Sequence, residues 1–399
     1  MSCRTNHFIE KASGYCRRIH RNSLVPNYGG YMIFYASKKD LQTAASIVSR
    51  AVPSHTTMTI LQNILLEAGN GEIILTASDT ELDITTRIPA VVEKRGNIAV
   101  DAKMFSDMIR KLPEEEVRIE TTENLQVLLT CGSAHFKIGG MNGDEFPERP
   151  MIERDESVTI SQLSLKSIIQ DTIFSVAVNE NNKIMTGELF EIRGDILRVV
   201  ALDGHRIAIR RIALKGSYSD RKVIVPGKTL LDVSRILNGE MDEIVNIYFT
   251  PNHIVFEMPG TIVVSRLIDG EYFNIDQMIS NDYDLKLTIN RSVLMDAVDR
   301  ALLFVRENDK KPIIMEIEDN SLKLSIDTPQ GSMKEEMETV KEGKDLVIGF
   351  NPRFILDALK AISDEQVTLY MMNAKAPCFI RDEDMSYTYL ILPVNFNRN

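Results

Sequence analysis

The sequence contains no apolar run near the ~20 residues that a membrane-spanning helix needs, and it does not begin like a signal peptide. These absences predict a cytoplasmic protein. Cysteine is also scarce, and the four cysteines form no CxxC pair and have no histidine at zinc-finger spacing: Cys3, Cys16, Cys131 and Cys378. We therefore expect free thiols, with no disulfide framework, no metal site and no cofactor.

Positive charge is in short supply as well. The 399 residues carry 46 lysines and arginines against 57 aspartates and glutamates, a net charge of -11. Domains that hold nucleic acid by broad electrostatic adhesion are usually basic on balance. A nucleic-acid-binding function would therefore need its positive charge concentrated on one part of the surface.

Catalytic motifs are also missing. Gly227-Lys228-Thr229 resembles the end of a phosphate-binding loop, but the glycine that this motif requires at position 222 is a lysine. Asp203, His205 and Arg206 could be drawn as a catalytic cluster, yet no nucleophile elbow, HExxH or paired-carboxylate motif accompanies them. We predict that the protein is not an enzyme. The lack of a helix-turn-helix or zinc-finger signal argues against sequence-specific DNA binding.

What the sequence does contain is an internal repeat. Three 15-residue segments align without gaps at a spacing of 125: residues 98–112, 223–237 and 348–362. Each predicts a short strand and then an amphipathic helix, followed by alternating strands. Three aspartates, each predicted to end a strand and begin a turn, recur 124 residues apart: Asp79, Asp203 and Asp327.

An earlier amphipathic helix also recurs in each unit. Its apolar positions are Leu41, Ala44, Ala45 and Val48; Leu165, Ile168, Ile169 and Thr172; and Leu294, Ala297, Val298 and Ala301. The chain is thus predicted to be one α+β unit repeated three times, each with two helices on one face of an antiparallel sheet of roughly eight strands.

We place the three domains at residues 32–154, 155–284 and 285–399, with linkers near 146–150 and 273–284. Residues 1–31 form an N-terminal extension outside this pattern, with five cations against the single acid Glu10: Arg4, Lys11, Arg17, Arg18 and Arg21. Three interpretations stay open for the extension: a disordered basic arm that touches DNA, an expression remnant, or a start codon assigned too early.

The second helix of every unit carries a cation at two equivalent positions, seven residues and therefore two turns apart: Lys103, Lys228 and Arg353, then Arg110, Arg235 and Lys360. One interpretation is an ordinary solvated helix face. The other is a ring whose helices point inward, in which twelve helices from a dimer would line a hole roughly 35 Å across. Duplex DNA would pass through such a hole with weak, salt-sensitive contacts and no sequence readout.

Four runs, at 201–208 (ALDGHRIA), 269–273 (DGEYF), 349–361 (GFNPRFILDALKA) and 389–394 (YLILPV), together resemble the bacterial sliding clamp, the beta subunit of DNA polymerase III. The resemblance covers Met32 to about Phe396. It implies the DNA-clamp fold and a head-to-tail homodimeric ring, helices inside, that encircles DNA in the nucleoid. The implied partners are replicative and repair polymerases, the clamp loader and mismatch-repair proteins, bound through short peptides. A repeat scaffold that binds peptides without encircling DNA is the alternative.

Carried over by position, the resemblance implies a partner-peptide pocket between the second and third domains. Its residues would be Met185, Leu202, Gly204, His205, Arg206, Ile207, Phe273, Gln277, Met278, Asn351, Phe354, Leu390, Leu392, Pro393 and Val394. The sequence departs from the family's common residues at four of these positions, since Leu202 replaces threonine, Phe273 replaces proline, and Leu390 and Leu392 replace valine and methionine. Plain core packing is the competing interpretation for Leu202, Ile207 and Leu392.

The resemblance also implies DNA contacts and a dimer interface. DNA would meet the six helix cations, together with Arg50, His55 and the loop that ends at Lys183. The dimer interface would use apolar side chains at both ends of the chain: Phe136, Ile138, Leu303 and Phe304. Acidic residues, Glu335, Glu336 and Glu338, would face His135 and Lys137 of the other subunit.

Overall fold

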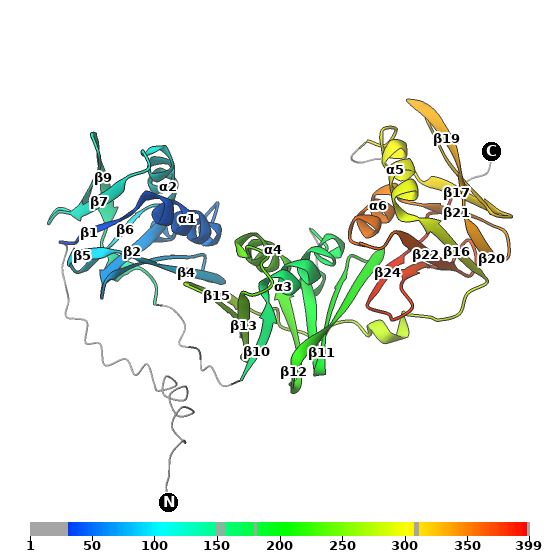
Figure 1. Ribbon diagram of the computed structural model, residues 1–399, viewed down its shortest axis with the longest axis horizontal. Coiled ribbons are helices and arrows are strands. Elements are labelled where there is room, and N and C mark those ends of the chain that lie inside the picture. The colour runs from blue at the N-terminus through cyan, green and yellow to red at the C-terminus, as the bar shows by residue number, and fades with distance from the viewer. Residues whose placement is uncertain (1–30, 149–151, 153–155, 179–181, 307–310, 397–399) are drawn as a thin grey trace, which may run out of the picture.

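The computed structural model describes residues 31–148, 152, 156–178, 182–306 and 311–396. Residues 1–30 of the N-terminal extension and residues 149–150 of the first predicted linker lie outside the described part. Figure 1 shows three lobes arranged in an arc, with helices on its concave side and sheets on its convex side. The three-domain α+β architecture with paired helices matches the expectation from the repeat.

Each lobe contributes two helices: α1 (Lys38–Val48) and α2 (Ala102–Lys111), α3 (Gln162–Gln170) and α4 (Gly227–Ile236), α5 (Arg291–Leu302) and α6 (Pro352–Lys360). Five of the six begin at a side-chain cap that accepts a backbone N–H: Ser37, Asp101, Ser161, Asn290 and Asn351. The twelve apolar positions predicted for the earlier helix are all buried. Thr172 lies just beyond α3, where its hydroxyl donates to the carbonyl of Ile168. No helix in the described ranges could cross a membrane.

The first lobe has nine strands: β1 (Ile33–Ser37), β2 (Asn63–Gly69), β3 (Glu72–Ser78), β4 (Leu82–Pro89), β5 (Val91–Lys94), β6 (Gly96–Asp101), β7 (Glu116–Thr121), β8 (Gln126–Cys131) and β9 (Ala134–Met141). The second has β10 (Ser157–Ser161), β11 (Gly187–Leu202), β12 (Arg206–Pro226), β13 (Ile244–Phe249), β14 (His253–Met258) and β15 (Thr261–Arg266). Here β11 and β12 are single long strands over the positions that β2 to β6 occupy in the first lobe.

The third lobe again has nine strands: β16 (Leu285–Asn290), β17 (Ile313–Glu318), β18 (Ser321–Thr328), β19 (Gly331–Glu338), β20 (Val340–Gly343), β21 (Leu346–Phe350), β22 (Gln366–Met371), β23 (Cys378–Arg381) and β24 (Tyr387–Ile391). Short 3-10 turns link the strands: η1 (Ser49–Ala51), η2 (Thr59–Gln62), η3 (Gly143–Glu145), η4 (Ile173–Ser175), η5 (Lys183–Thr186) and η6 (Ile275–Gln277).

Neighbouring lobes are joined by antiparallel strand pairing. β4 of the first lobe pairs with β15 of the second, and β12 of the second pairs with β24 of the third. We call these two junctions seam 1–2 and seam 2–3. An equivalent backbone hydrogen bond lies at the end of each seam. The Arg87 N–H donates to the Gly260 carbonyl at seam 1–2, and the Arg211 N–H donates to the Ser386 carbonyl at seam 2–3. The sheets therefore run on from one domain into the next.

The turn prediction holds for two of the three recurring aspartates. Asp79 and Asp203 each follow a strand and accept two backbone N–H groups of the turn. The prediction is wrong for Asp327, which lies inside β18 opposite Ser332. The hairpin ends one residue later in this unit, and the hydroxyl of Thr328 accepts from the Gln330 N–H instead.

Candidate functional site

Three residues of the predicted peptide pocket form one row across seam 2–3. Leu202 on β11 lies opposite Ile207 on β12, and Ile207 lies opposite Leu390 on β24. All three are buried in a small apolar cluster, against which Met185 of η5 and Phe273 pack. The cluster is separate from the cores of the lobes, so these residues form the floor between the second and third domains.

The rim of this floor is polar and accessible. Gly204 adopts a φ of 83°, a left-handed conformation that suits glycine, and it lets the turn before β12 leave His205 exposed. The His205 ring lies 6.2 Å from the ring of Phe354 on α6. Leu392, which is 37% exposed, continues the floor outward and donates its N–H to the His205 carbonyl. A ligand can therefore reach apolar and polar groups together.

Arg206 has a structural role in this site. Its guanidinium donates to Asp357 at 2.7 Å and to Asp203 at 2.9 Å, donates to the carbonyl of Phe174, and lies 4.4 Å from the Phe354 ring centre. These contacts link three segments across seam 2–3. A side chain held this firmly orients the site rather than transferring protons.

The remaining predicted pocket residues surround this centre less closely. Gln277 and Met278 are exposed on the segment after β15, next to Ile275 of the apolar cluster. Asn351 caps α6 by accepting from the Arg353 N–H, which explains that residue without a ligand. Pro393 and Val394 are half-buried, and Val394 N–H donates to the Gly349 carbonyl.

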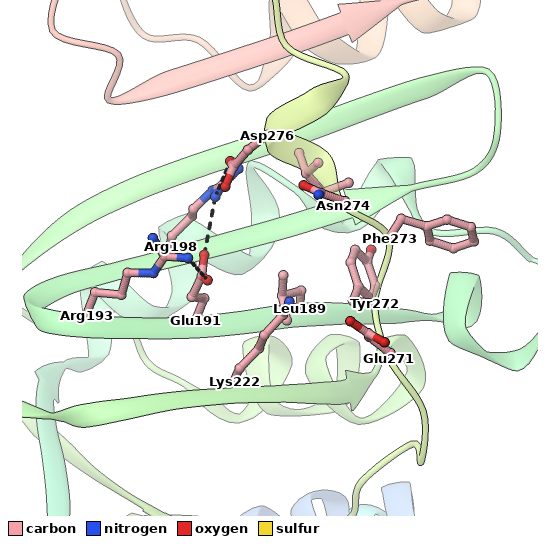
Figure 2. A pocket seen from close by; sticks show the side chains of 11 residues that line it. Leu189, Glu191, Arg193, Arg198, Lys222, Glu271, Tyr272, Phe273, Asn274 and Asp276 are labelled. Carbon is pink, nitrogen blue, oxygen red and sulfur yellow. Dashed lines mark hydrogen bonds and ion pairs between the residues drawn. The ribbon is translucent and has the colours of Figure 1, made fainter.

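A pocket of about 400 Å³ lies behind the segment that joins the second and third lobes (Figure 2). Its apolar side includes Leu189, Tyr272 and Ile275, which belong to the cluster beneath the predicted peptide pocket. Its other side is charged, and Figure 2 shows Arg198 between Glu191 and Asp276. This pocket was not foreseen from the sequence.

All six helix cations predicted to face DNA are exposed. Three of them have carboxylate partners within the chain: Lys228 with Asp79 at 2.8 Å, Arg110 with Asp107 at 2.6 Å, and Arg235 with Asp232 at 3.8 Å. Lys103, Arg353 and Lys360 have no ion pair among the described residues. Exposed ion pairs are weak, so the paired cations can still exchange a carboxylate for a phosphate.

The other predicted DNA contacts differ in accessibility. His55 and Lys183 are exposed, and the loop residues 179–181 lie outside the described part of the chain. Arg50 is half-buried and lies 3.8 Å from Asp232 across seam 1–2. Burial raises the pKa of Asp232, and the Arg50 charge opposes that shift.

The predicted dimer residues lie at the two ends of the arc, where Figure 1 places β9 and β19. Phe136 and Ile138 are on β9, and Phe136 is 37% exposed. Leu303, at the end of α5, is 82% exposed, which is unusual for a leucine. Phe304 lies against Gly331 at the start of β19.

Sequence reasoning missed the partners of Arg206, namely Asp357 and Phe174. A signal for Asp357 was nevertheless present in the repeat, because aspartates recur 125 residues apart at Asp107, Asp232 and Asp357. Asp232 faces Arg50 across seam 1–2, as Asp357 faces Arg206 across seam 2–3. The aspartate of the second helix thus receives an arginine of the preceding domain at both seams.

Comparison with known proteins agrees with this architecture. The N-terminal, central and C-terminal domains of the DNA polymerase III beta subunit family match residues 32–150, 159–274 and 276–395. A beta sliding clamp of Staphylococcus aureus is 32% identical over 375 residues, which cover 91% of this chain and 99% of the relative.

Solved structures show the same arrangement. The crystal structure of a DNA polymerase III beta subunit from Eubacterium rectale has 54% identity and a TM-score of 0.89, covering 92% of this chain and all of the other. The Bacillus subtilis DNA polymerase sliding clamp has 30% identity, the same TM-score and the same coverage. The fold is therefore that of a three-domain clamp. The chain belongs to the DNA polymerase III beta subunit family.

Proposed function

We propose that two copies of this chain close head to tail into a ring that encircles duplex DNA and tethers replicative and repair polymerases to it. Membership of the family supports a non-enzymatic processivity factor in DNA replication. A cytoplasmic, nucleoid-associated location goes with that function. The domain boundaries at 32–154, 155–284 and 285–399 belong to the proposal, supported by the three family matches.

The observation that carries the ring is the pair of strands left open at the ends of the arc. Seam 1–2 and seam 2–3 each join the strand after a domain's recurring turn to the last strand of the next domain. Among the described strands, β19 pairs only with β18, and β9 pairs with β6 only through Gly140 and Met141. Exposed strand edges of this kind favour pairing with another chain. A third and equivalent seam, between two copies, would use both.

The internal seams also predict the register of this third seam. The hairpin of β18 and β19 begins with Ser321 opposite Glu338, and the equivalent hairpin of β3 and β4 begins with Glu72 opposite Pro89. Counting three residues back from Glu338 and from Pro89 makes Glu335 equivalent to Thr86. Ala134 corresponds to Thr261, because each is the first residue of its strand after an equivalent turn. Thr86 lies opposite Thr261.

The third seam is therefore expected to set Glu335 of one copy opposite Ala134 of the other. Continuing the strands sets Met333 opposite Phe136 and Ser332 opposite Lys137. Leu303 then occupies the place of Phe174, whose ring lies 5.8 Å from that of Tyr389 in seam 2–3. Phe136 occupies the place of Tyr389, so the exposed Leu303 would pack on Phe136 of the other copy.

The partner-binding site of this proposal is the floor of seam 2–3, which we call the groove. A partner peptide would bury apolar side chains against Leu392, Phe273 and Met185, above the row formed by Leu202, Ile207 and Leu390. His205, Gln277 and Phe354 supply polar and aromatic rims that orient it. Changing Met185 and Leu392 to alanine should weaken binding of a polymerase tail peptide and leave the ring intact.

The decisive test is retention on DNA. The protein is loaded by a clamp loader onto nicked circular DNA, and its retention is measured before and after the circle is cut once. Loss on linearisation is the result expected for a ring held by topology. Equal retention on both forms would overturn the ring in favour of a scaffold or direct DNA adhesion.

The register has its own test. Cysteines introduced at Lys137 and Ser332 should form an intermolecular disulfide on mild oxidation, because directly opposed Cβ atoms lie about 4.5–5.5 Å apart. The matched control places cysteines at His135 and Ser332, two positions out of register on the same face. Equal or faster cross-linking of the control would show that the register is wrong.

A further inference from the structure

The segment 272–278, which we call the strap, leads from the second domain to the third and takes part in two sites. Phe273, Gln277 and Met278 belong to the proposed groove. Tyr272, Ile275 and Asp276 line the pocket of about 400 Å³ behind it. Figure 2 shows Phe273 projecting away from the charged residues of that pocket. The strap therefore has the groove on one face and a cavity on the other, and its buried Tyr272 and Ile275 side chains pack into the apolar cluster.

Besides the packing of Ile275 in the apolar cluster, two polar contacts hold the strap over the cavity. At one end, the buried Tyr272 donates its hydroxyl to the Val200 carbonyl at 3.2 Å. At the other end, the Asp276 carboxylate lies 2.8 Å from the guanidinium of Arg198 on β11. Between them, Asn274 is exposed. The Asp276 attachment is adjacent to Gln277 and Met278, the groove residues on this side.

Arg198 is itself held in place. Its side chain is 11% exposed, and the nitrogen that meets Asp276 also lies 3.3 Å from the carboxylate of Glu191. Its Nε and Nη2 atoms are buried and find no hydrogen-bond partner among the residues that the structure describes. Glu191 is also bound by Arg193 at 2.7 Å. The guanidinium thus presents Asp276 with a fixed charge from a rigid strand.

We propose that Arg198 and Asp276 are positioning residues for the groove, holding the strap so that Phe273, Gln277 and Met278 are ordered before a partner peptide binds. The inference rests on the proposed function and deepens it. Ordering a segment in advance removes an entropy cost from binding. Neither residue belongs to the groove itself.

The test compares Asp276→Asn with Glu271→Gln. Glu271 is an exposed carboxylate next to the strap that lines the same pocket and has no ion pair among the described residues. The affinity of a fluorescent polymerase tail peptide should fall about two- to fivefold in Asp276→Asn, the size expected for a partly exposed ion pair. Amide hydrogen exchange of the free protein should speed up at residues 273–278, while the melting temperature stays at the wild-type value. Glu271→Gln should match wild type throughout, and Asp276→Glu should recover most of the affinity.

Further variants separate the possible failures. Phe273→Ala should weaken binding of the peptide strongly. If Phe273→Ala and Leu392→Ala both bind the peptide with wild-type affinity, the assignment of the groove as the peptide site is wrong. If they weaken binding but Asp276→Asn behaves like Glu271→Gln, the strap inference is overturned. It is also overturned if exchange at 273–278 accelerates without loss of affinity. Combining Asp276→Asn with Arg198→Gln should cost no more than the larger single change, so fully additive losses would contradict the attachment.

Discussion

Seam 1–2 and seam 2–3 share a backbone plan and differ in their side chains. At seam 1–2 the hydroxyls of Thr86 and Thr261 meet at 3.1 Å, and the ion pair between Arg50 and Asp232 is long, at 3.8 Å. At seam 2–3 aromatic rings meet across the junction and Arg206 reaches several acceptors. Strand pairing sets the backbone geometry of both junctions, and the side chains determine which other contacts each junction can make. At seam 2–3 the exposed Leu392 lies beside the buried apolar floor of the pairing strands.

The open ends of the arc extend this comparison to a third junction. In the repeat, Leu303 is equivalent to Arg50 of seam 1–2 and to Phe174 of seam 2–3. Asp107 is equivalent to Asp232 and Asp357. No arginine of the third domain occupies the position of Arg50 or Arg206, and Asp107 pairs with Arg110 of its own helix. We therefore expect the third seam to depend on apolar contact more than either internal seam.

The largest effect is expected from Leu303→Asp combined with Phe136→Asp. Burying carboxylates in place of the opposed apolar side chains should convert the dimer to monomer, with a dimer dissociation constant raised on the order of 100-fold or more. Light scattering across a concentration series measures this. Val91→Asp is the matched control, since Val91 is 63% exposed on an edge strand away from the seam. A double variant that stays dimeric at the wild-type concentration would contradict the third seam.

Breaking the polar links sharpens the contrast between the internal seams. Arg206→Gln removes a guanidinium that is 11% exposed and leaves Asp357 without its partner, which should cost about 2 kcal/mol. Arg50→Gln should cost under about 0.5 kcal/mol, because its pair is longer and more exposed. Hydrogen exchange at the paired strands β24 and β15 reports each seam separately. If the two variants lost similar amounts of hydrogen-exchange protection, the two ion pairs would contribute equally to the stability of their seams.

A fully buried carboxyl group occupies one position of the repeat in the middle domain. Glu188 is fully buried, and neither of its carboxylate oxygens has a hydrogen-bond partner in the part of the chain that the structure describes, whereas the equivalent positions hold the buried Ile64 and Ile313. Burial raises the pKa of Glu188 well above its ordinary range. The folded protein therefore keeps a proton that the unfolded chain releases at its ordinary pKa of about 4.3.

The stabilising contribution of this proton is complete below the unfolded pKa and is lost as pH rises toward the raised folded pKa. Glu188→Ile should remove that dependence and stabilise the middle domain at neutral pH by about 1–3 kcal/mol. Denaturant unfolding between pH 4 and pH 8 measures the difference. An unchanged pH slope in the variant would show that another group causes it.

The repeat made the lobes predictable, because the positions that bury a helix face recur with the helical period. The twelve apolar positions of the earlier helix needed no tertiary information. The links across the seams could not be predicted, since Arg206 meets Asp357 from 151 residues away and Lys228 meets Asp79 from 149 residues away. The turn was wrongly assigned to Asp327 because the hairpin of the third unit ends one residue later. This shift hardly changes the spacing between the recurring aspartates, but it makes Thr328 the residue whose side chain caps the turn. For the groove, the sequence resemblance named residues, but it could not separate the buried floor formed by Leu202 and Ile207 from the accessible Leu392.

The smallest effects are expected on the concave face, where paired and unpaired cations can be compared at equal number. Changing Lys103, Arg353 and Lys360 to glutamine removes charges that have no carboxylate partner within the described ranges. Changing Arg110, Lys228 and Arg235 removes charges already matched by carboxylates. Each phosphate that the variant no longer neutralises should reduce the salt slope of DNA affinity by about 0.9. The unpaired set should therefore reduce that slope more, because the paired set must first release its carboxylates. The measurement is the equilibrium affinity of each triple variant for a short linear duplex, from which a ring can slide off, over a salt series. Equal slopes for both sets would mean that DNA displaces the internal carboxylates at no cost, and a wild-type slope for both would make the six cations an ordinary solvated face.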